Sequence, residues 1–526
     1  MKPFDPEKDE RWQTPRNSGV RWSLVSGFAL IILLFIWKQF PANETSPDDL
    51  IVYCAAGIRL PVEEAAKQFE KEFGVSITLD YDSSGALEGK LQLDRDSNKT
   101  RADLYIPADV SFAERARDKM LTSESIPLAS FRLVLASSPE EDLSFSTLDE
   151  FLALEVPFSI CNVAAGVGKK TKGTLEKLGK WEVFESAKKT TSPRVTDAAA
   201  AIKASDAVQA GFIWDTTARQ FGLKIHELAE LEKVSSRISV NVTSSSAKPA
   251  QALLFARYLA SAQKGQTHFS KHHFSSVPGD EWEKSPELTV YCGGLNRDAV
   301  YQTLRDFEKR EGCRIIEHFN GCGSLVANIK TVGQNASNTT MPDAFFTCDA
   351  SYMTKVGDLF GEARDVSGTD VVMLVRKGNP MGLKTLADLS KEDLSLGTTD
   401  PKASTLGDLS WQLLEKTGVA SVIKENDSWE VTTPTAHELI MQMEAHPKLD
   451  VALVYLANCQ NLTKGKFETI AIDDPLAKAT QNIAVAKGSK FPQLSARLID
   501  AITSATSRER FLRAGFDWKV SGEPEK

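Results

Sequence analysis

The chain is 526 residues long, 42% of its residues are hydrophobic, 25% are charged, and its formal net charge is −9. This length exceeds one ordinary domain, so we expect at least two. The acidic balance argues against a nucleic-acid-binding protein, which needs a basic face to displace counterions from phosphates. Binding of small anions stays possible, because backbone N–H groups and helix N-termini supply local positive potential.

An apolar run near the N-terminus predicts a transmembrane anchor over residues 22–38. The uncharged stretch from Trp22 to Trp37 is flanked by Arg21 and Lys38. With its flanks it is about long enough to cross a thin bilayer as a helix at ~1.5 Å per residue. The positive-inside rule then makes 1–21 a cytoplasmic tail and 39–48 a linker outside the membrane. The cations that precede the run are Lys2, Lys8, Arg11, Arg16 and Arg21.

Two other interpretations of this run stay open. A cleaved signal peptide would end in small residues, but Phe40-Pro41-Ala42 is not an A-x-A site and no lipidation cysteine follows it. A buried soluble helix is the third possibility. An anchor and a signal peptide both export the chain. We therefore expect a single-pass protein of the inner (cytoplasmic) membrane with its domains in the periplasm or extracytoplasmic space.

The chain contains an internal repeat of about 240 residues, which indicates a domain duplication. The segment from Leu50 to Leu87 aligns without a gap with the segment from Leu288 to Leu325, at a constant offset of 238. Both segments contain the triplet Phe-Glu-Lys, and the correspondence continues towards the end of each copy. We predict two tandem domains, 49–284 and 285–520, with the boundary near Lys284 and a short tail at 521–526.

Strand patterns and helix patterns alternate within each copy. In the first copy, a β-rich run at 50–54 precedes a helical pattern that stops at Gly74, and a second β-rich run follows at 75–81. This alternation predicts an α/β fold with mostly parallel sheets and with ligands at the carboxyl ends of the strands. The apolar positions of the helical pattern are Val62, Ala65, Ala66 and Phe69.

Three loops of the first copy follow predicted strands and are rich in small residues, at 55–57, 82–85 and 162–168. Small residues let backbone N–H groups approach an anion, and Ser83 and Ser84 add hydroxyl donors. Most loops of this kind only turn the chain or cap a helix. Their recurrence at equivalent places in one domain favours a binding site.

Several motifs resemble the periplasmic molybdate-binding protein family, the type II periplasmic solute-binding proteins of ABC transporters. In the first copy they are Cys-Ala-Ala-Gly at 54–57, Tyr-x-Ser-Ser-Gly-Ala-Leu at 81–87, Ala-Asp-Leu-Tyr-Ile-Pro-Ala-Asp at 102–109 and Ala-Gly-Phe-Ile-Trp at 210–214. The second copy is similar to the family through Gly-Ser-Leu at 323–325, Leu-Val-Arg-Lys-Gly-Asn-Pro at 374–380 and the run 451–455.

The resemblance implies two tandem type II periplasmic-binding domains, each two-lobed with a hinge of two crossing strands. These strands would be 131–137 and 237–242 in the first copy, and 371–376 and 482–487 in the second. The family holds a tetrahedral oxyanion, such as molybdate or tungstate, with uncharged donors in the cleft. The ligand-binding residues implied by the resemblance are Gly57, Ser83, Ser84, Gly168, Val195 and Trp214 in the first copy, and Gly294, Leu295, Cys322, Gly407, Thr433 and Tyr455 in the second.

The chain departs from the family pattern at several of these positions. Gly57 and Leu295 stand where the family has a serine, and Trp214 stands where it usually has a tyrosine. The second copy has Gly321 and Cys322 in place of the two serines of the first. A hydrogen bond to a charged group contributes roughly 1.5–3 kcal/mol, so the loss of one donor lowers affinity about ten- to a hundredfold unless the backbone compensates.

The seven cysteines of the chain contain no C-x-x-C pair. In the second copy Cys292, Cys322 and Cys348 follow predicted strand ends, so we expect them to line one cleft. Three thiolates would suit a soft metal such as copper or zinc, two of them would suit a disulfide, and all three would equally suit small buried positions. Cys54 matches Cys292, which favours a structural role for that pair.

Two functional hypotheses follow. In the first, an extracytoplasmic binding protein captures an oxyanion between closing lobes and presents it to an ABC permease or a sensor. In the alternative, the cleft of the second copy carries a metal or a redox-active cysteine group. We do not expect an enzyme, a cofactor or a nucleic-acid partner, because the sequence contains no catalytic triad order, H-E-x-x-H motif or P-loop.

Overall fold

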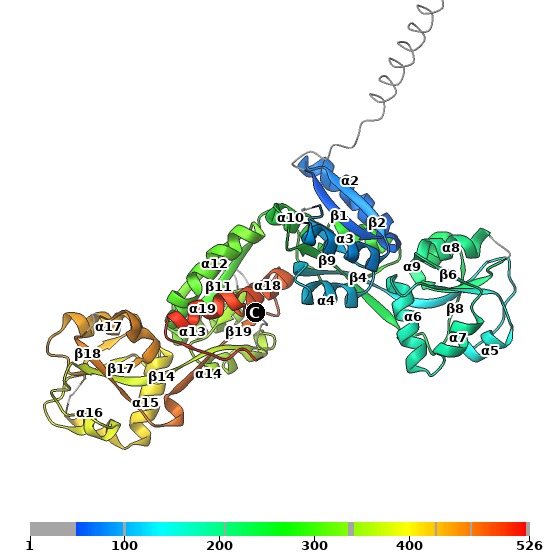
Figure 1. Ribbon diagram of the computed structural model, residues 1–526. Helices are drawn as coiled ribbons and strands as arrows, with labels where there is room; N and C mark the ends of the chain where they lie inside the picture. The colour runs from blue at the N-terminus through cyan, green and yellow to red at the C-terminus, as the bar shows by residue number, and fades with distance from the viewer. Residues whose placement is uncertain are drawn as a thin grey trace, which may run out of the picture. The chain divides into compact units, whose positions relative to one another are not determined.

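The computed structural model of the chain describes residues 49–521 apart from 98–100, 205–206, 335–340, 427–428 and 463–464 (Figure 1). The anchor predicted over 22–38, the tail before it and most of the linker lie outside the described residues. Within the described part, no helix is both long enough and apolar enough to span a membrane. Two tandem α/β domains make up this part, and their main hydrophobic cores are separate, one from Leu50 to Phe274 and the other from Leu288 to Phe516.

Domain 1 alternates strands with helices, as its sequence pattern predicts. Short 3-10 helices are written η. Its elements are β1 (Leu50–Ala55), η1 (Ala56–Ile58), α2 (Arg59–Phe73), β2 (Ile77–Asp82), α3 (Ser84–Asp96), β3 (Leu104–Ile106), α4 (Val110–Asp118), β4 (Thr122–Ser137), α5 (Leu148–Ala153), β5 (Phe158–Cys161), α6 (Gly166–Lys177), α7 (Trp181–Ala187), β6 (Thr190–Ser192), α8 (Val195–Ala204), β7 (Ala210–Trp214), α9 (Asp215–Phe221), β8 (Lys224–His226), β9 (Ser235–Thr243), α10 (Pro249–Ala260), α11 (Gly265–Lys271) and β10 (Ser275–Ser276).

The strands of domain 1 follow the order β2-β1-β3-β9-β4-β7-β5-β6. Lobe 1 contains β1 with parallel partners β2 and β3, and lobe 2 contains β5 with parallel partners β6 and β7. The long strand β4 belongs to both lobes, because it pairs antiparallel with β9 in the first and with β7 in the second. The two strands predicted to cross between the lobes, 131–137 and 237–242, lie in β4 and β9.

Domain 2 repeats this topology, with the order β12-β11-β13-β19-β14-β17-β15-β16 and with β14 shared by both lobes. The predicted crossing strands 371–376 and 482–487 fall in β14 and largely in β19. Its elements are β11 (Glu287–Gly293), η2 (Gly294–Asn296), α12 (Arg297–Glu311), β12 (Arg314–Asn320), α13 (Cys322–Gln334), β13 (Ala344–Phe346), α14 (Ala350–Thr354), η3 (Gly357–Leu359), β14 (Arg364–Arg376), η4 (Leu386–Ser390), β15 (Leu396–Thr399), α15 (Thr405–Lys416), α16 (Val419–Glu425), β16 (Trp429–Thr433), α17 (Ala436–Ala445), β17 (Val451–Tyr455), η5 (Leu456–Asn461), β18 (Phe467–Ala471), η6 (Pro475–Ala477), β19 (Lys478–Val485), α18 (Pro492–Ile502), α19 (Ala505–Arg513) and β20 (Asp517–Trp518).

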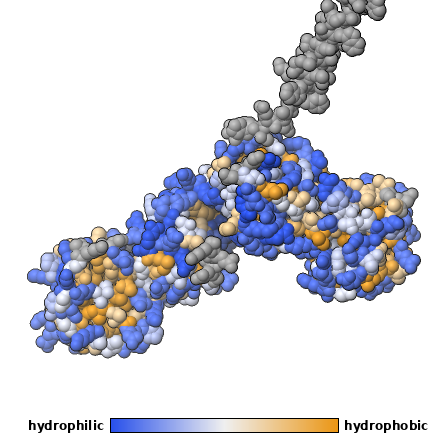
Figure 2. Space-filling model, viewed as in Figure 1, coloured by the Kyte–Doolittle hydropathy of each residue, from blue (hydrophilic) through white to orange (hydrophobic). Residues whose placement is uncertain are grey.

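Equivalent residues begin and end the equivalent helices of the two domains. α2 ends at Gly74 and α12 ends at Gly312, with φ of 69° and 64°, a left-handed conformation that glycine adopts without strain. Asp109 and Asp349 cap α4 and α14 by accepting a backbone N–H two residues further on. Both domains therefore use the same residues to begin and end the helices that follow their strands. Hydrophilic residues cover much of the face seen in Figure 2.

Candidate functional site

In domain 1 the predicted loops converge on a small cavity between the lobes. The cavity measures about 10 Å³, while a single water molecule needs roughly 10–15 Å³. The lobes also contact each other directly, because the backbone N–H of Gly85 donates to the carbonyl of Ala164 across the cleft at 2.8 Å. The residues that line the cavity are Ala55, Ala56, Gly57, Asp82, Ser83, Ser84, Ala108, Ala165, Gly166, Val167, Arg194, Val195 and Trp214.

Side chains of lobe 2 fill this cleft. A Cβ placed on Gly57 would lie 2.9 Å from Cγ1 of Val195 and 3.6 Å from Cδ1 of Trp214. Trp214 is fully buried and stacks on Phe131 with ring centroids 4.2 Å apart. Its indole N–H is buried and has no hydrogen-bond partner. The space that a serine side chain would need at position 57 is thus taken by valine and tryptophan.

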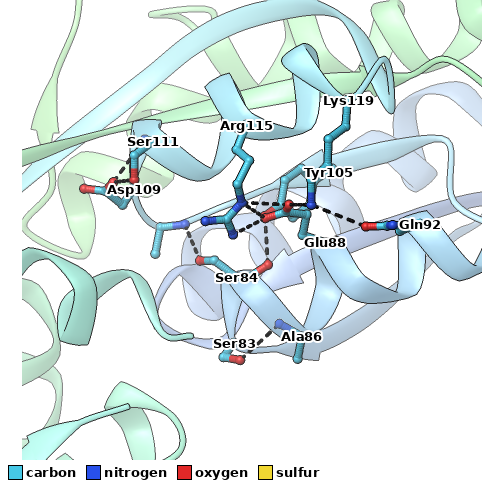
Figure 3. A network of polar contacts seen from close by, with 11 residues as sticks. Ser83, Ser84, Ala86, Glu88, Gln92, Tyr105, Asp109, Ser111, Arg115 and Lys119 are labelled. Atoms are coloured by element: carbon cyan, nitrogen blue, oxygen red, sulfur yellow. Dashed lines mark hydrogen bonds and ion pairs between the residues drawn. The ribbon is translucent and has the colours of Figure 1, made fainter. Parts of the chain in front are cut away.

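A polar network behind the cleft fixes the position of Ser84 (Figure 3). The Ser84 hydroxyl accepts the backbone N–H of Ala108 at 3.0 Å, and the Tyr105 hydroxyl donates to the Ser84 carbonyl at 2.8 Å. One turn further along α3, the buried carboxylate of Glu88 pairs with Arg115 and Lys119. Lobe 1 therefore holds the start of α3 rigidly against the cleft.

Domain 2 keeps an open space at the equivalent place. Its cavity measures about 170 Å³ and lies between the strand ends of lobe 1 and the helix start of lobe 2. The first residues of α17 line it from lobe 2, where the partial positive charge of a helix N-terminus is felt. The lining residues are Gly294, Leu295, Arg297, Asp298, Phe319, Asn320, Gly321, Cys348, Ser404, Thr435, Ala436, His437, Glu438, Tyr455 and Asn458.

Tyr455 is the most distinctive side chain of this cavity. It occupies the last position of β17, is 1% exposed, and its hydroxyl is a buried group with no hydrogen-bond partner. Burial raises the pKa of the Tyr455 hydroxyl well above its usual range, so the group stays protonated. A buried donor without a partner is costly, and a ligand oxygen in the adjacent cavity would satisfy it.

Two cysteines of domain 2 meet beneath the cavity. The backbone N–H of Cys348 donates to Sγ of Cys322 at 3.1 Å. A Cβ placed on Gly293 would lie 2.3 Å from Sγ of Cys348 and 2.9 Å from Sγ of Cys322, so the sulfurs are at most 5.2 Å apart, the sum of those distances. We call Cys322 and Cys348 the cleft dithiol.

The surroundings of the cleft dithiol shift the pKa values of its two thiols in opposite directions. Burial disfavours ionisation of Cys322, but hydrogen bonds from Cys348 outweigh it and lower the Cys322 pKa. The hydrogen bond to Cys322, together with burial, raises the pKa of Cys348 well above its usual range.

The third cysteine that we predicted for this cleft has a different role. The Cys292 thiol donates to the carbonyl of Gly293 at 3.6 Å, as the Cys54 thiol donates to the carbonyl of Ala55 in domain 1. Both of these cysteines are fully buried. Among the residues that the structure describes, no group of three or more His, Cys, Asp or Glu side chains is arranged to hold a metal ion. The three-cysteine metal site is therefore not formed in this structure, and the seven cysteines are free thiols.

Four predicted ligand-binding residues are not among the residues that line the two cleft cavities. Gly168 and Gly407 lie in the first turns of α6 and α15, where a Cβ would come within 2.1 Å of the Asn162 carbonyl oxygen and 2.4 Å of the Thr399 carbonyl oxygen. Both glycines thus serve close backbone packing. The Thr433 hydroxyl donates to a backbone carbonyl at 2.9 Å, and Cys322 lies behind Cys348.

Several residues that line the domain 2 cavity were not among the predicted site residues. Ser404, Thr435 and Asn458 stand in loops or short 3-10 helices of lobe 2, where hydrophobic periodicity gives no signal. Arg297 begins α12, and its contact with the Phe319 ring, 5.0 Å from guanidinium to centroid, depends on the tertiary fold.

Ion pairs join the lobes of each domain beside the cavity, with opposite polarity. In domain 1 the carboxylate of Asp109 in lobe 1 lies 3.3 Å from Nζ of Lys170 in lobe 2. In domain 2 the carboxylate of Asp408 in lobe 2 accepts the Tyr352 hydroxyl at 3.0 Å and lies 3.1 Å from Nζ of Lys355, both in lobe 1. We call these contacts the lobe clasps.

The family of bacterial extracellular solute-binding proteins matches residues 50–275 and, a second time, residues 288–517. The molybdate-binding protein ModA of Mycobacterium bovis is 21% identical over 253 residues, 46% of this chain and 88% of that protein. The periplasmic molybdate-binding protein of Azotobacter vinelandii is 20% identical with a TM-score of 0.37, over 44% of this chain and 100% of that one. Iron-bound HitA from Pseudomonas aeruginosa is 16% identical with a TM-score of 0.37, over 45% of this chain and 89% of that one.

Proposed function

The chain belongs to the family of bacterial extracellular solute-binding proteins and carries the family's domain twice, and from this premise we propose that it captures a small oxyanion in the cleft of domain 2. The observation that supports the proposal is the buried, unpartnered hydroxyl of Tyr455 beside a cavity of about 170 Å³ between the lobes. A tetrahedral anion of the molybdate, tungstate, sulfate or phosphate type offers the oxygen acceptors that this donor lacks.

The electrostatics of the cavity favour an anion. The N-terminal end of α17, with its partial positive charge, lines the cavity from lobe 2, and Arg297 lines it from lobe 1. The Tyr455 hydroxyl is held protonated by burial, so it donates without adding charge. Asp298 and Glu438 also line the cavity, so these donors have to outweigh two carboxylates for an anion to bind.

Domain 1 differs in the same region. In domain 1, Val195 and Trp214 occupy the volume that is open in domain 2. The remaining cavity of about 10 Å³ is smaller than any oxyanion. In this closed conformation the first domain has no space for the ligand. We assign the ligand site to domain 2 and a supporting role to domain 1.

Isothermal titration calorimetry on the full chain with molybdate, tungstate, sulfate and phosphate tests this assignment. Tyr455→Phe keeps the ring and removes one donor, so we expect binding to weaken about ten- to a hundredfold. Trp214→Phe removes the corresponding donor of domain 1 and should leave the affinity unchanged. If Trp214→Phe weakens binding and Tyr455→Phe does not, the site is in domain 1. If none of the four anions binds, the oxyanion assignment is wrong, although family membership stands.

We further propose that residues 22–38 tether both domains outside the inner membrane, where the captured anion reaches an ABC permease or a sensor. The cationic residues that precede the apolar run support this orientation. Cell fractionation followed by protease treatment of spheroplasts tests it. The chain should stay with the membranes, and protease should remove both domains. Release of the full mature chain into the soluble periplasmic fraction would indicate a cleaved signal peptide instead.

A further inference from the structure

Three coordinated differences distinguish the floor of the domain 2 cleft from that of domain 1. Ser84 of domain 1 corresponds to Cys322, and Ala108 corresponds to Cys348. The hydrogen bond between these positions is kept, from the backbone N–H of Ala108 to Oγ of Ser84 at 3.0 Å and from that of Cys348 to Sγ of Cys322 at 3.1 Å. The two domains thus share this backbone contact, and the hydroxyl and methyl groups of domain 1 correspond to two thiols in domain 2.

The third difference makes room for these thiols. Domain 1 has Ala55 where domain 2 has Gly293, and a methyl at position 293 would stand 2.3 Å from one sulfur and 2.9 Å from the other. The conformation of Gly293 does not require glycine, because its φ is −57°. The missing Cβ is explained by the volume of the two sulfur atoms, which indicates that the pair is accommodated as a unit.

A backbone donor of the kind that stabilises negative charge faces one of the sulfurs. Sγ of Cys322 accepts the backbone N–H of Cys348 at 3.1 Å. The same kinds of group hold anions elsewhere in proteins. Here the protein directs such a group at its own sulfur, and a thiolate is the form that binds metal.

From this geometry we infer that the cleft dithiol binds one soft monovalent metal ion, Cu(I) or its analogue Ag(I), between Sγ of Cys322 and Sγ of Cys348. Two metal–sulfur bonds form, the thiols give up their protons to solvent, and no electron is transferred, because the metal arrives in its monovalent state. Soft thiolate ligands select Cu(I), and a linear arrangement of two sulfurs completes its coordination. Structural zinc sites need four ligands, and no third His, Cys, Asp or Glu joins the pair in the described residues.

Closure of the lobes would enclose the bound metal. Both sulfurs belong to lobe 1, at the start of α13 and after β13, so lobe 1 alone supplies the ligands. Lobe 2 meets lobe 1 close to them, since the backbone N–H of Ser324 donates to the Ala403 carbonyl at 3.2 Å. Cys322 is 0% exposed and Cys348 is 5% exposed in this closed form. Metal therefore enters when the lobes part and is shielded when they meet.

The test titrates the reduced full chain with Cu(I) under anaerobic conditions, in competition with a chromophoric Cu(I) chelator, and repeats the titration with Ag(I). The variant Cys322→Ser/Cys348→Ala installs the residues of domain 1, whose packing in that domain shows that they fit the same backbone. Cys313→Ser/Cys459→Ser is the matched control, because it removes two thiols that are partly exposed and lie outside the pair. We expect one tightly bound ion per chain, lost in the first variant and kept in the control.

Three results would overturn the inference. They are equal Cu(I) binding by the parent and the Cys322→Ser/Cys348→Ala variant, Zn(II) binding to the same two sulfurs as tightly as Cu(I), and recovery of Cys322 and Cys348 as a disulfide from protein exported by cells. The inference does not depend on the oxyanion proposal. If Cu(I) binds while all four oxyanions fail, only the proposed function is wrong, and the reverse result removes only the metal site.

Discussion

The buried carboxylate of Glu88 gives the sharpest stability prediction. Its side chain is 4% exposed, while those of its partners Arg115 and Lys119 are each 40% exposed. The two sides of the cluster are therefore unequal in their access to water. Removal of the cations leaves a buried charge without a partner, whereas removal of the carboxylate leaves two cations that water can solvate. Domain 2 has Val326 at the position of Glu88, so valine is the replacement that this backbone already accommodates.

We expect Arg115→Met/Lys119→Met to destabilise domain 1 by about 3–5 kcal/mol, the cost of an uncompensated buried charge. Glu88→Val should cost less than about 1 kcal/mol, because half-exposed cations contribute little. The triple variant Glu88→Val/Arg115→Met/Lys119→Met should regain most of the loss, since it removes the buried charge as well as its partners.

Hydrogen exchange of the full chain, followed by mass spectrometry of peptides from α3 and α4, measures these differences within domain 1. Each 1.4 kcal/mol corresponds to about a factor of ten in exchange rate, so the double variant should exchange at least roughly a hundredfold faster than the parent. Peptides from α13 and α14 of domain 2 serve as the internal reference. Equal exchange in the double variant and in Glu88→Val would refute the argument from unequal burial, and so would a triple variant no more stable than the double.

Two further predictions concern the clefts. Gly293→Ala places a methyl against both sulfurs of the cleft dithiol, so overpacking should lower the free energy of unfolding by about 1–3 kcal/mol, measured by thermal unfolding. The same change should be tolerated in the Cys322→Ser/Cys348→Ala background. An equal cost in both backgrounds would contradict the steric explanation. Burial works against the ionised form of Asp408, but hydrogen bonds from Gln412 and from the lobe clasp outweigh it, so its pKa in the closed domain is lowered. The clasp then stabilises closure above the ordinary aspartate pKa of about 3.9 and is lost as the pH falls through the lowered value. Small-angle scattering should show expansion of the parent in that range and none in Asp408→Asn, and a pH response that survives in Asp408→Asn would exclude the clasp as its cause.

The sequence predicted most of the fold because its signals are local and occur twice. The helix stop at Gly74, the cap at Asp109 and the strand runs recur at a nearly constant offset in domain 2, so each copy supports the interpretation of the other. The convergence of Gly57 with Trp214 also follows from topology, because the strand ends of both lobes face the cleft.

The sequence did not predict which cleft is filled. That outcome depends on Cγ1 of Val195 reaching the space left by Gly57, a contact between segments far apart in the chain. The pairing of Cys322 with Cys348, and the exclusion of Cys292 from it, depend likewise on which way each side chain points from its strand end. Hydrophobic periodicity does not show which side chain fills a given space between distant segments. It also does not show why a loop contains a glycine: Gly168 lies in a predicted binding loop but serves close backbone packing.

In domain 1, side chains of the protein make the contacts between the lobes that a ligand makes in other binding proteins. In a binding protein that closes on its ligand, the contacts of the ligand with both lobes supply the free energy that favours the closed form. In domain 1 these contacts are made by the protein itself, because Trp214 and Val195 of lobe 2 pack against Gly57 of lobe 1 and a backbone hydrogen bond joins Gly85 to Ala164. Opening this domain would break these contacts, whereas in domain 2 a cavity of about 170 Å³ lies between the lobes at the same place. The duplicated domains therefore combine one cleft that is filled by its own side chains with one that keeps a cavity beside the buried hydroxyl of Tyr455.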